Sequence, residues 1–240
     1  MPAKKIHLIN LGIFSADIIR VLIIAVKIIA IIFVTMILLD TGPQLSFLQH
    51  ILYFDYWLFT KINRQWTNSF FDVVLPFLRE AEFWLPFYLF LLVFALLNFS
   101  KKGGWWCIAL IMTSIISDLV SSSGVKQLIF RYRPCQDPVI SQYVRVLVKY
   151  CPGSSSFTSS HACNHFSAAM FIFMTLRHTS KWWRLIFLWA FAISYAQIYV
   201  GVHYPLDILG GTILGCSIGY GMSVFFKSRL GILGTNNIQA

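Results

Sequence analysis

The chain has 240 residues, of which 58% are hydrophobic and only 12% are charged, and its mean hydropathy is +0.71. A soluble domain usually carries about 25% charged residues, so this composition predicts an integral membrane protein. The formal charge is +10, but the basic residues are scattered between apolar blocks and form no continuous stripe, which argues against a nucleic-acid partner. We expect one domain over residues 1–240.

Six apolar stretches are candidates for transmembrane helices, because each approaches the roughly 20 residues that span a bilayer core. A helix is favoured there since it satisfies its own backbone hydrogen bonds. In chain order the stretches are Val21 to Leu39, Trp84 to Phe99, Trp105 to Val125, His161 to Leu176, Trp182 to Val202 and Pro205 to Phe226. The sequence therefore predicts an all-α bundle of six transmembrane helices, in which the first apolar run is retained as a span.

The segment between the first two stretches, Asp40 to Phe83, mixes aromatic residues with scattered charges. Aromatic rings with polar edges suit the headgroup layer of a membrane. We therefore predict short interfacial helices here and no second soluble domain.

The last stretch carries Gly211, Gly215 and Gly219 at intervals of four residues. This spacing lets a neighbouring helix backbone approach closely. It predicts that the last helix lies inside the bundle, although glycine is also tolerated in any membrane helix.

The basic residues predict how the chain is inserted. With six spans, the two termini and the second and fourth loops share one side, where Asp17 is the sole acid among many Lys and Arg residues. The other side holds nearly all of the acidic residues. Since Lys and Arg favour cytoplasmic loops, we expect both termini in the cytoplasm. For a bacterial source, we expect the inner membrane and a periplasmic site.

Cys135 and Cys151 both lie between the third and fourth stretches, on the predicted outer side. An oxidising compartment would let them pair, so a disulfide across this loop is one expectation and two free thiols are the other. The remaining cysteines fall inside predicted spans, where a thiol is usually an apolar filler.

Polar residues gather at the ends of the third, fourth and sixth stretches. After the third stretch, Lys126 is followed by Arg133 and Pro134. A phosphate dianion needs fixed cations and donors, and Arg supplies a planar fork while Lys supplies a point charge. The alternative is that both side chains merely snorkel to the membrane surface.

Ser159, Ser160 and His161 begin the fourth stretch. The N–H groups at a helix N-terminus form an anion site, the Ser159 hydroxyl adds a donor, and His161 can give a proton to a leaving alkoxide. The alternative is an ordinary serine N-cap. His165 lies one turn beyond His161, but no carboxylate or thiol set completes a zinc site, so we expect no metal or other cofactor.

His203 and Asp207 are four residues apart at the start of the sixth stretch. In a helix that begins near Pro205 they lie on one face. A carboxylate that accepts from one imidazole nitrogen fixes the tautomer and leaves the other nitrogen free to attack phosphorus. The pair is a candidate nucleophile with its orienting group, and a purely structural pair is the alternative.

These three groups resemble, in order and spacing, the signature of the type-2 phosphatidic acid phosphatase (PAP2) superfamily. That signature reads K-x6-R-P, then P-S-G-H, then S-R-x5-H-x3-D, and the chain has K-Q-L-I-F-R-Y-R-P, T-S-S-H and A-Q-I-Y-V-G-V-H-Y-P-L-D. The resemblance implies a membrane lipid phosphatase in which His203 attacks phosphorus, Asp207 activates it and His161 protonates the leaving group. It implies that the phosphate is held by Lys126, Arg133, Ser159, Ser160 and Gln197.

Gln197 departs from the signature, which has an arginine at this position. An amide donates a hydrogen bond without a charge, and losing a charge-assisted hydrogen bond costs about 1.5–3 kcal/mol. Arg131 is the nearest cation in the sequence that could replace it, yet two residues from the motif we expect a surface charge.

The resemblance implies a lipid phosphate as substrate. For a bacterial source the first choice is undecaprenyl diphosphate, followed by phosphatidylglycerophosphate, phosphatidic acid and lipid A phosphate. Two other classes stay open. Thr158, Ser160, Ala196 and Gln197 replace signature residues, which suits a pseudoenzyme that binds or moves phospholipid, and a transporter would need ionisable residues at mid-bilayer on several helices.

Overall fold

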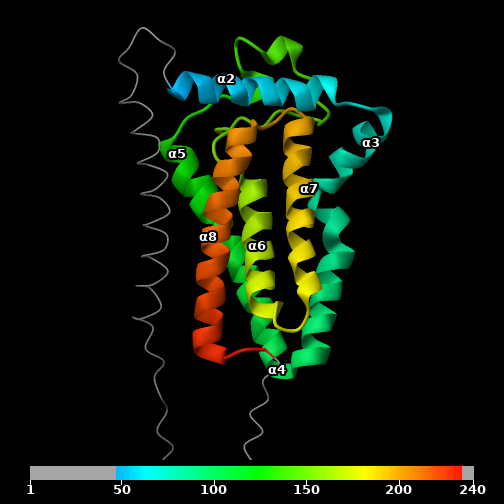
Figure 1. Cartoon of the computed structure of the whole chain (residues 1–240), viewed down its shortest axis with the longest axis vertical. Coiled ribbons are helices and arrows are strands. Elements are labelled where there is room, and N and C mark those ends of the chain that lie inside the picture. The colour runs from blue at the N-terminus through cyan, green and yellow to red at the C-terminus, as the bar shows by residue number, and fades with distance from the viewer. Residues whose placement is uncertain (1–46, 234–240) are drawn as a thin grey trace, which may run out of the picture.

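A computed structural model describes residues 47–233, and all regular elements in that part of the chain are helical. The first predicted span, Val21 to Leu39, lies outside it. The long helices stand side by side, and α2 lies across one end of them (Figure 1). In chain order the elements are α2 (Phe47–Thr60), η1 (Lys61–Gln65), α3 (Ser69–Leu78), η2 (Ala81–Trp84), α4 (Leu85–Asp118), η3 (Leu119–Val125), α5 (Lys126–Leu128), η4 (Pro134–Gln136), η5 (Ser141–Tyr143), α6 (Ser160–Leu176), η6 (Lys181–Leu185), α7 (Ile186–Tyr199) and α8 (Pro205–Leu230).

α4 consists of two limbs that meet at Ser100, where the backbone leaves the helical region (φ 49°, ψ −127°). A Cβ on Gly103 would lie 1.9 Å from the carbonyl oxygen of Ala95, so the chain folds back on itself directly after this break. The two limbs correspond to the predicted second and third stretches. Glycine is needed at position 103 because no side chain fits in this turn.

Two helical segments of the described residues are long and apolar enough to cross a membrane, Ala81–Leu128 and Pro205–Leu230. The first of them contains the Ser100 break. α6 has 17 residues and α7 has 14, so both are shorter than the roughly 20 residues of a typical span. The predicted fifth stretch is divided, since η6 precedes α7 as a separate helical turn.

α8 packs against α6 through its glycine face, which consists of Gly211, Gly215 and Gly219. A Cβ at these three positions would lie 2.5, 2.3 and 2.2 Å from the backbone oxygens of Ser159, the N-cap of α6, and of Cys163 and Ser167 within α6. α6 also contacts α4 and α7, and it lies between α7 and α8 in Figure 1. The predicted close approach of a neighbouring helix to the glycines of the last helix is confirmed, but another side of α8 is exposed at Leu209, Ile213, Tyr220 and Val224.

Asn63, in the middle of η1, fastens the α2–α3 region to the bundle. It is fully buried, and its amide donates 2.8 Å hydrogen bonds to the carbonyl oxygens of Arg145 and Tyr199. Asp72 on α3 accepts from the same two residues, at 2.7 Å from Arg145 and 2.6 Å from the Tyr199 hydroxyl. The loop between α5 and α6 is thereby held against η1 and α3.

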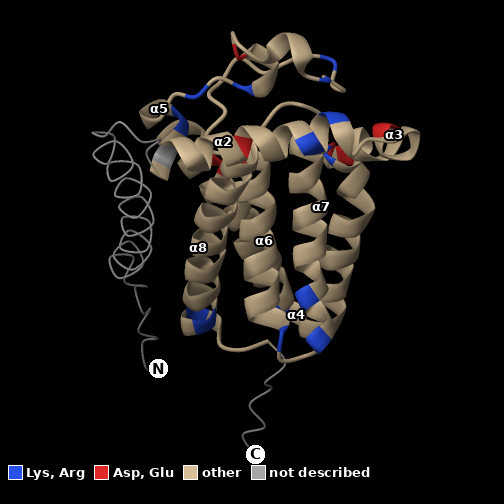
Figure 2. Ribbon diagram, turned by 45° about the horizontal axis from the view of Figure 1, so that its top comes forward, with Lys and Arg blue, Asp and Glu red and all other residues tan. Residues whose placement is uncertain are grey.

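Charges divide between the two ends of the bundle. Figure 2 shows Asp and Glu at the end where α2 and α3 lie, together with some Lys and Arg, whereas the opposite end shows only Lys and Arg. This is the asymmetry on which the predicted orientation depends.

The loop between α5 and α6 contains a disulfide between Cys135 and Cys151, whose Cα atoms are 6.1 Å apart. The first of the two expectations for these cysteines is confirmed. Cys163 is buried, and Cys107 and Cys216 are half-buried thiols in the helices.

Candidate active site

His203 lies in the turn between α7 and α8, and Asp207 lies in the first turn of α8. Pro205 begins this helix, and the Asp207 carboxylate accepts a 2.8 Å hydrogen bond from the backbone N–H of Tyr204, which fixes it at the helix N-terminus. His203 Nδ1 lies 3.5 Å from Asp207 Oδ2. The Ser156 hydroxyl donates to that same oxygen at 2.5 Å and lies 3.4 Å from His203 Nδ1. The start of α8 therefore places the carboxylate next to Nδ1 of the imidazole.

Arg133 occupies the other side of His203. Its Nη1 lies 3.0 Å from His203 Nε2 and donates to the Val202 carbonyl oxygen at 3.1 Å. Its Nε and Nη2 donate to Ser154, at 2.9 and 3.1 Å. The residue is 3% exposed, and burial lowers the pKa of its guanidinium to about 10. The side chain is thus a fixed cation at neutral pH, directed at the imidazole.

The setting of His203 keeps its ring neutral. Burial is the main reason that its pKa falls from 6.5 to about 4; the positive charges of Arg133 and Lys126 lower it further, and the hydrogen bond with Asp207 opposes them. A neutral imidazole whose Nδ1 carries the proton has its lone pair on Nε2, the nitrogen that faces Arg133. This is the form that can act as a nucleophile.

Arg131 is not a surface charge, so that prediction is wrong. Its side chain is 18% exposed and pairs with two buried carboxylates, Asp207 Oδ1 at 2.8 Å and Asp55 Oδ2. It also stacks on the ring of Tyr204, 4.1 Å from the ring centroid. The physical reason is the burial of Asp207, because a buried carboxylate requires a cation or hydrogen-bond donors. Since both carboxylates engage its guanidinium, Arg131 does not replace the arginine that the signature has at Gln197.

Asp55 and Ser156 were missed by the sequence analysis. Asp55 on α2 is 1% exposed, and its other oxygen accepts a 2.8 Å hydrogen bond from the N–H of Leu206, next to Asp207. A carboxylate within an aromatic segment could have indicated a buried, paired residue, but nothing in the local spacing connects Asp55 to α8. Ser156 belongs to a run of three serines, and the run itself does not tell which hydroxyl faces the carboxylate.

Ser159 and Ser160 begin α6 as predicted, but they are partly engaged. The Ser159 oxygen accepts from Ala162 N at 3.4 Å as the N-cap, and the Ser159 N–H donates to the Asp207 carbonyl oxygen at 3.1 Å. That N–H is therefore not available to an anion, contrary to our expectation. The Ser160 hydroxyl lies 3.0 Å from the Ser122 hydroxyl.

Lys126 and His161 lie close to this centre, but the polar atoms of their side chains have no hydrogen-bond partner among the described residues. Neither side chain forms a hydrogen bond with another of residues 47–233. Electrostatic interactions nevertheless connect Lys126 with Arg133 and connect His161 with both Lys126 and His203. The structure thus brings the ends of α5, α6 and α8 together, as the three sequence groups predicted.

Gln197 is placed differently from the other predicted site residues. It is fully buried, and neither polar atom of its side chain has a hydrogen-bond partner in the described part of the chain. Its backbone oxygen accepts from the N–H groups of Val202 and His203, at 3.2 and 3.3 Å. Gln197 therefore supports the turn that carries His203, and its amide contacts none of the other predicted phosphate-binding groups by a hydrogen bond.

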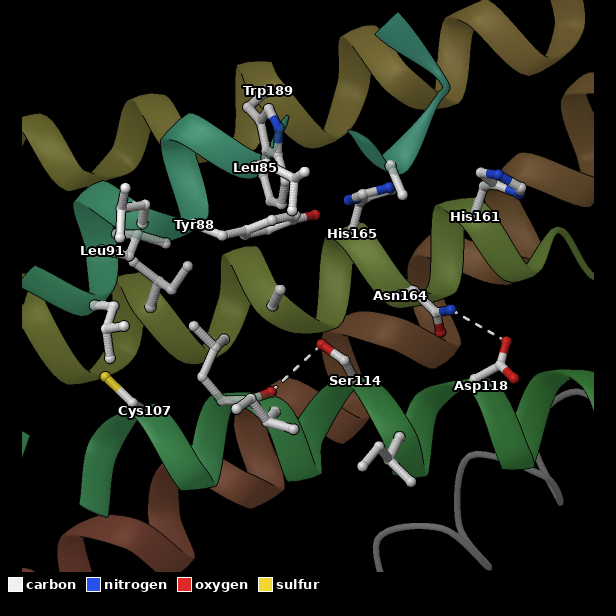
Figure 3. A pocket seen from close by; sticks show the side chains of 18 of the residues that line it. Leu85, Tyr88, Leu91, Cys107, Ser114, Asp118, His161, Asn164, His165 and Trp189 are labelled. Carbon is white, nitrogen blue, oxygen red and sulfur yellow. Dashed lines mark hydrogen bonds between the residues drawn. The ribbon is translucent and has the colours of Figure 1, made fainter. Parts of the chain in front are cut away.

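A cavity of about 730 Å³ is lined by both limbs of α4, by the side of α6 that carries His161, and by Trp189 of α7. Figure 3 shows His161 and His165 pointing from α6 toward the cavity, with Asp118 and Asn164 at the same end as His161. Asn164 donates to Asp118 at 3.2 Å. Most of the remaining wall is apolar, formed by residues such as Leu85, Tyr88, Leu91, Leu92, Leu110, Ile111, Ile115, Ile172 and Trp189.

The arrangement can support displacement at phosphorus. A neutral imidazole is oriented by a carboxylate, a guanidinium faces the other ring nitrogen, and a second imidazole lines a largely apolar cavity. Within residues 47–233, no group of three or more His, Cys, Asp or Glu side chains is arranged to hold a metal ion.

Comparison with known proteins connects this geometry to one family. The sequence model of the PAP2 superfamily matches residues 103–230, more than half of the chain. A lipid A 4'-phosphatase of Bacteroides thetaiotaomicron is 32% identical over 163 residues, which cover 66% of this chain and 70% of that protein. An undecaprenyl-diphosphatase of Sulfolobus acidocaldarius is 32% identical over 146 residues, 60% of this chain and 64% of that protein.

A solved structure has the same fold. The PAP2-type phosphatidylglycerolphosphate phosphatase of Bacillus subtilis superposes with a TM-score of 0.59 at 19% identity, over 85% of this chain and 96% of that one. The family match covers the three motifs and the helices that carry them. This chain belongs to the PAP2 superfamily.

Proposed function

We propose that this chain is a membrane lipid phosphatase that forms a phosphohistidine at His203. The observation that carries the proposal is the placement of this imidazole, with Nδ1 3.5 Å from the Asp207 carboxylate and Nε2 3.0 Å from Arg133. A phosphate oxygen that takes over the Arg133 N–H now directed at His203 Nε2 would free the lone pair of that nitrogen and lie next to it. The carboxylate would stabilise the positive ring that forms on attack.

The reaction has two displacements. In the first, His203 Nε2 forms a bond to phosphorus, the bond from phosphorus to the lipid oxygen breaks, and that oxygen takes its electron pair and a proton from His161. In the second, a water molecule gives a proton to His161 and attacks phosphorus. The nitrogen–phosphorus bond then breaks, which releases inorganic phosphate and restores His203. No metal ion is required, because Arg133 and Lys126 supply the positive charge.

The membrane arrangement belongs to the same proposal. Six spans would be formed by the region before residue 47, the two limbs of α4, α6, α7 and α8, with α2 and α3 in the interface. The end of the bundle that shows only Lys and Arg (Figure 2) would face the cytoplasm together with both termini. The site would then open on the outer side, the periplasmic side of a bacterial inner membrane.

The apolar cavity supports a lipid as the leaving group, because an acyl or prenyl chain can fill it while His161 faces the ester oxygen. The relatives act on two kinds of lipid phosphate, lipid A and undecaprenyl diphosphate. We take undecaprenyl diphosphate as the first substrate and lipid A phosphate as the second.

The test is phosphate release by the purified protein in detergent with a chelator present, followed by trapping of an acid-labile, alkali-stable phosphoprotein. His203→Ala should abolish both signals. The matched control is His178→Ala, which removes a histidine at the other end of α6 and should keep both. Near-normal release by His203→Ala would contradict the assigned nucleophile. Lipid binding without release from any lipid phosphate would instead indicate a pseudoenzyme.

A further inference from the structure

Arg79 is an unpaired arginine in the wall of the cavity. It lies between α3 and η2 and lines the same cavity as His161. Its Nε is buried, and that atom has no hydrogen-bond partner among residues 47–233. Over the same residues its guanidinium enters no ion pair, unlike Arg131 with Asp55 and Asp207.

The charge of Arg79 acts on the reacting groups. Electrostatic interactions connect it with His161 and with Arg133. Burial lowers the pKa of its guanidinium, and the neighbouring charge of Glu80 opposes that change, so the side chain stays a cation. Its Nε is buried without a hydrogen-bond acceptor among residues 47–233, and a buried charged donor without an acceptor is costly. A bound anion would remove that cost.

The positions of the attacking and leaving groups in the proposed reaction indicate which part of the substrate would carry this anion. In the proposed function, His203 attacks from the Arg133 side and His161 faces the leaving oxygen. His161 lines the cavity, so the part of the substrate that follows the leaving oxygen would enter the cavity. Arg79 is therefore a cation on the leaving-group side of phosphorus.

Asp118 is another charged group in the cavity wall, but it is already engaged. Its carboxylate accepts hydrogen bonds from Asn164 Nδ2 and from the Ser122 hydroxyl, both at 3.2 Å. A negatively charged leaving group would lie against the Arg79 wall and away from Asp118.

Resting on the proposed function, we infer that Arg79 binds the second phosphate of a lipid diphosphate, the one that stays on the lipid after cleavage. The His203 nitrogen forms its bond to the terminal phosphorus, and the bond from that phosphorus to the bridging oxygen breaks. The electron pair stays on the bridging oxygen, so the leaving group is a lipid monophosphate whose growing negative charge Arg79 offsets. A monoester leaves as a neutral alcohol and gains nothing from Arg79.

The experiment compares a prenyl diphosphate with the prenyl monophosphate of the same chain length. Arg79→Gln keeps donor atoms and removes the charge. We expect it to lower kcat/KM for the diphosphate by about ten- to a hundredfold, the loss of one charge-assisted hydrogen bond. For the monophosphate the expected loss is below about threefold, which also shows that the variant is folded. Arg79→Lys, which keeps a cation, should recover part of the diphosphate activity.

Arg64→Gln is the matched control, because Arg64 is exposed, lies on η1 and does not line the cavity. It should leave kcat/KM for both substrates unchanged. Equal losses for diphosphate and monophosphate in Arg79→Gln would overturn the inference. Wild-type release from lipid A phosphate but not from the diphosphate would also overturn it and leave the proposed phosphatase intact. No release from any lipid phosphate would remove the proposed function itself.

Discussion

The two imidazoles of the candidate site have opposite surroundings. His203 is 2% exposed and lies between Asp207 and Arg133, and Arg131 holds the far oxygen of the carboxylate. His161 forms no hydrogen bond with another described residue and lines the cavity. One half of the site is internally complete, and the other half has unused hydrogen-bonding groups.

This difference separates two tasks. The nucleophile half is oriented before the substrate arrives, so little free energy is spent on arranging it during the reaction. The leaving-group half gains its partners only when a lipid phosphate is bound, so its interactions can favour the transition state over the empty site. Substitutions in the two halves should therefore differ in how their effects depend on the substrate.

Asp207→Asn should have the largest effect, and it should be the same for every substrate. The amide can donate to His203 and hold the wrong tautomer, and Arg131 loses one of its two carboxylates. We expect kcat/KM to fall by about a thousandfold for alkyl and aryl phosphates alike. Asp72→Asn is the matched control, since this aspartate on α3 pairs with a different arginine, Arg145. The variant should keep kcat/KM. A loss below about tenfold in Asp207→Asn would show that the carboxylate is structural.

His161→Gln should have a smaller effect that depends on the leaving group. Without a proton donor, kcat for an alkyl phosphate should fall by about a hundredfold. An aryl phosphate leaves without a proton, so its kcat should fall by less than about fivefold. His165→Gln changes the next turn of the same helix, where His165 packs against Trp189 at 4.8 Å between ring centroids, and it should affect both substrates equally. Equal losses in His161→Gln would remove its role as the acid.

The acid limb of the pH profile reports the nucleophile half. Because the pKa of His203 is lowered to about 4, the ring is neutral above that pH, and protonation removes the attacking lone pair below it. We expect kcat/KM to fall as the pH drops through about 4 and then by tenfold per pH unit. An unchanged circular dichroism spectrum over the same pH range would exclude acid unfolding as the cause. An acid limb at the ordinary value of 6.5 would show that His203 is not buried as described.

Gln197→Arg should have the smallest effect, an increase in kcat/KM of about threefold to tenfold. It restores the arginine of the family signature at a buried position whose amide has no hydrogen-bond partner among residues 47–233. The gain is limited because burial of the new charge offsets part of it. Gln197→Met is the companion variant, and a loss of several-fold there would show that the amide binds phosphate. No gain with Arg would mean that the interior has closed around the amide.

The features that the sequence predicted depend on local spacing. The glycine face of α8 follows from a repeat of four, and the pairing of Cys135 with Cys151 follows from two cysteines in one loop. His203 and Asp207 lie one helical turn apart, so any helix that begins at Pro205 brings them together. These features persist whatever the rest of the chain does.

The features that escaped prediction depend on contacts between distant segments. Asp55 meets Arg131 across 76 residues, and no local pattern specifies that pair. Arg131 was expected at the surface because burial is decided by the packing of α2 over α8, which the sequence of the loop does not contain. The path of the loop determines that the hydroxyl of Ser156, and not that of a neighbouring serine, donates to Asp207. Arg79 lines a cavity whose other walls come from α4, α6 and α7, so its own segment does not indicate its surroundings.

The glycine face of α8 acts as a spacer of fixed width. At Gly211, Gly215 and Gly219, α8 contributes no side chain between its own backbone and that of the helix that carries His161. A change in the thickness of the surrounding bilayer should therefore leave the distance between α6 and α8 at these glycines unchanged. The distance between the proton donor and the nucleophile is therefore set by the contact between α6 and α8. Room for a bulky lipid has to come from movement of α4 and α7.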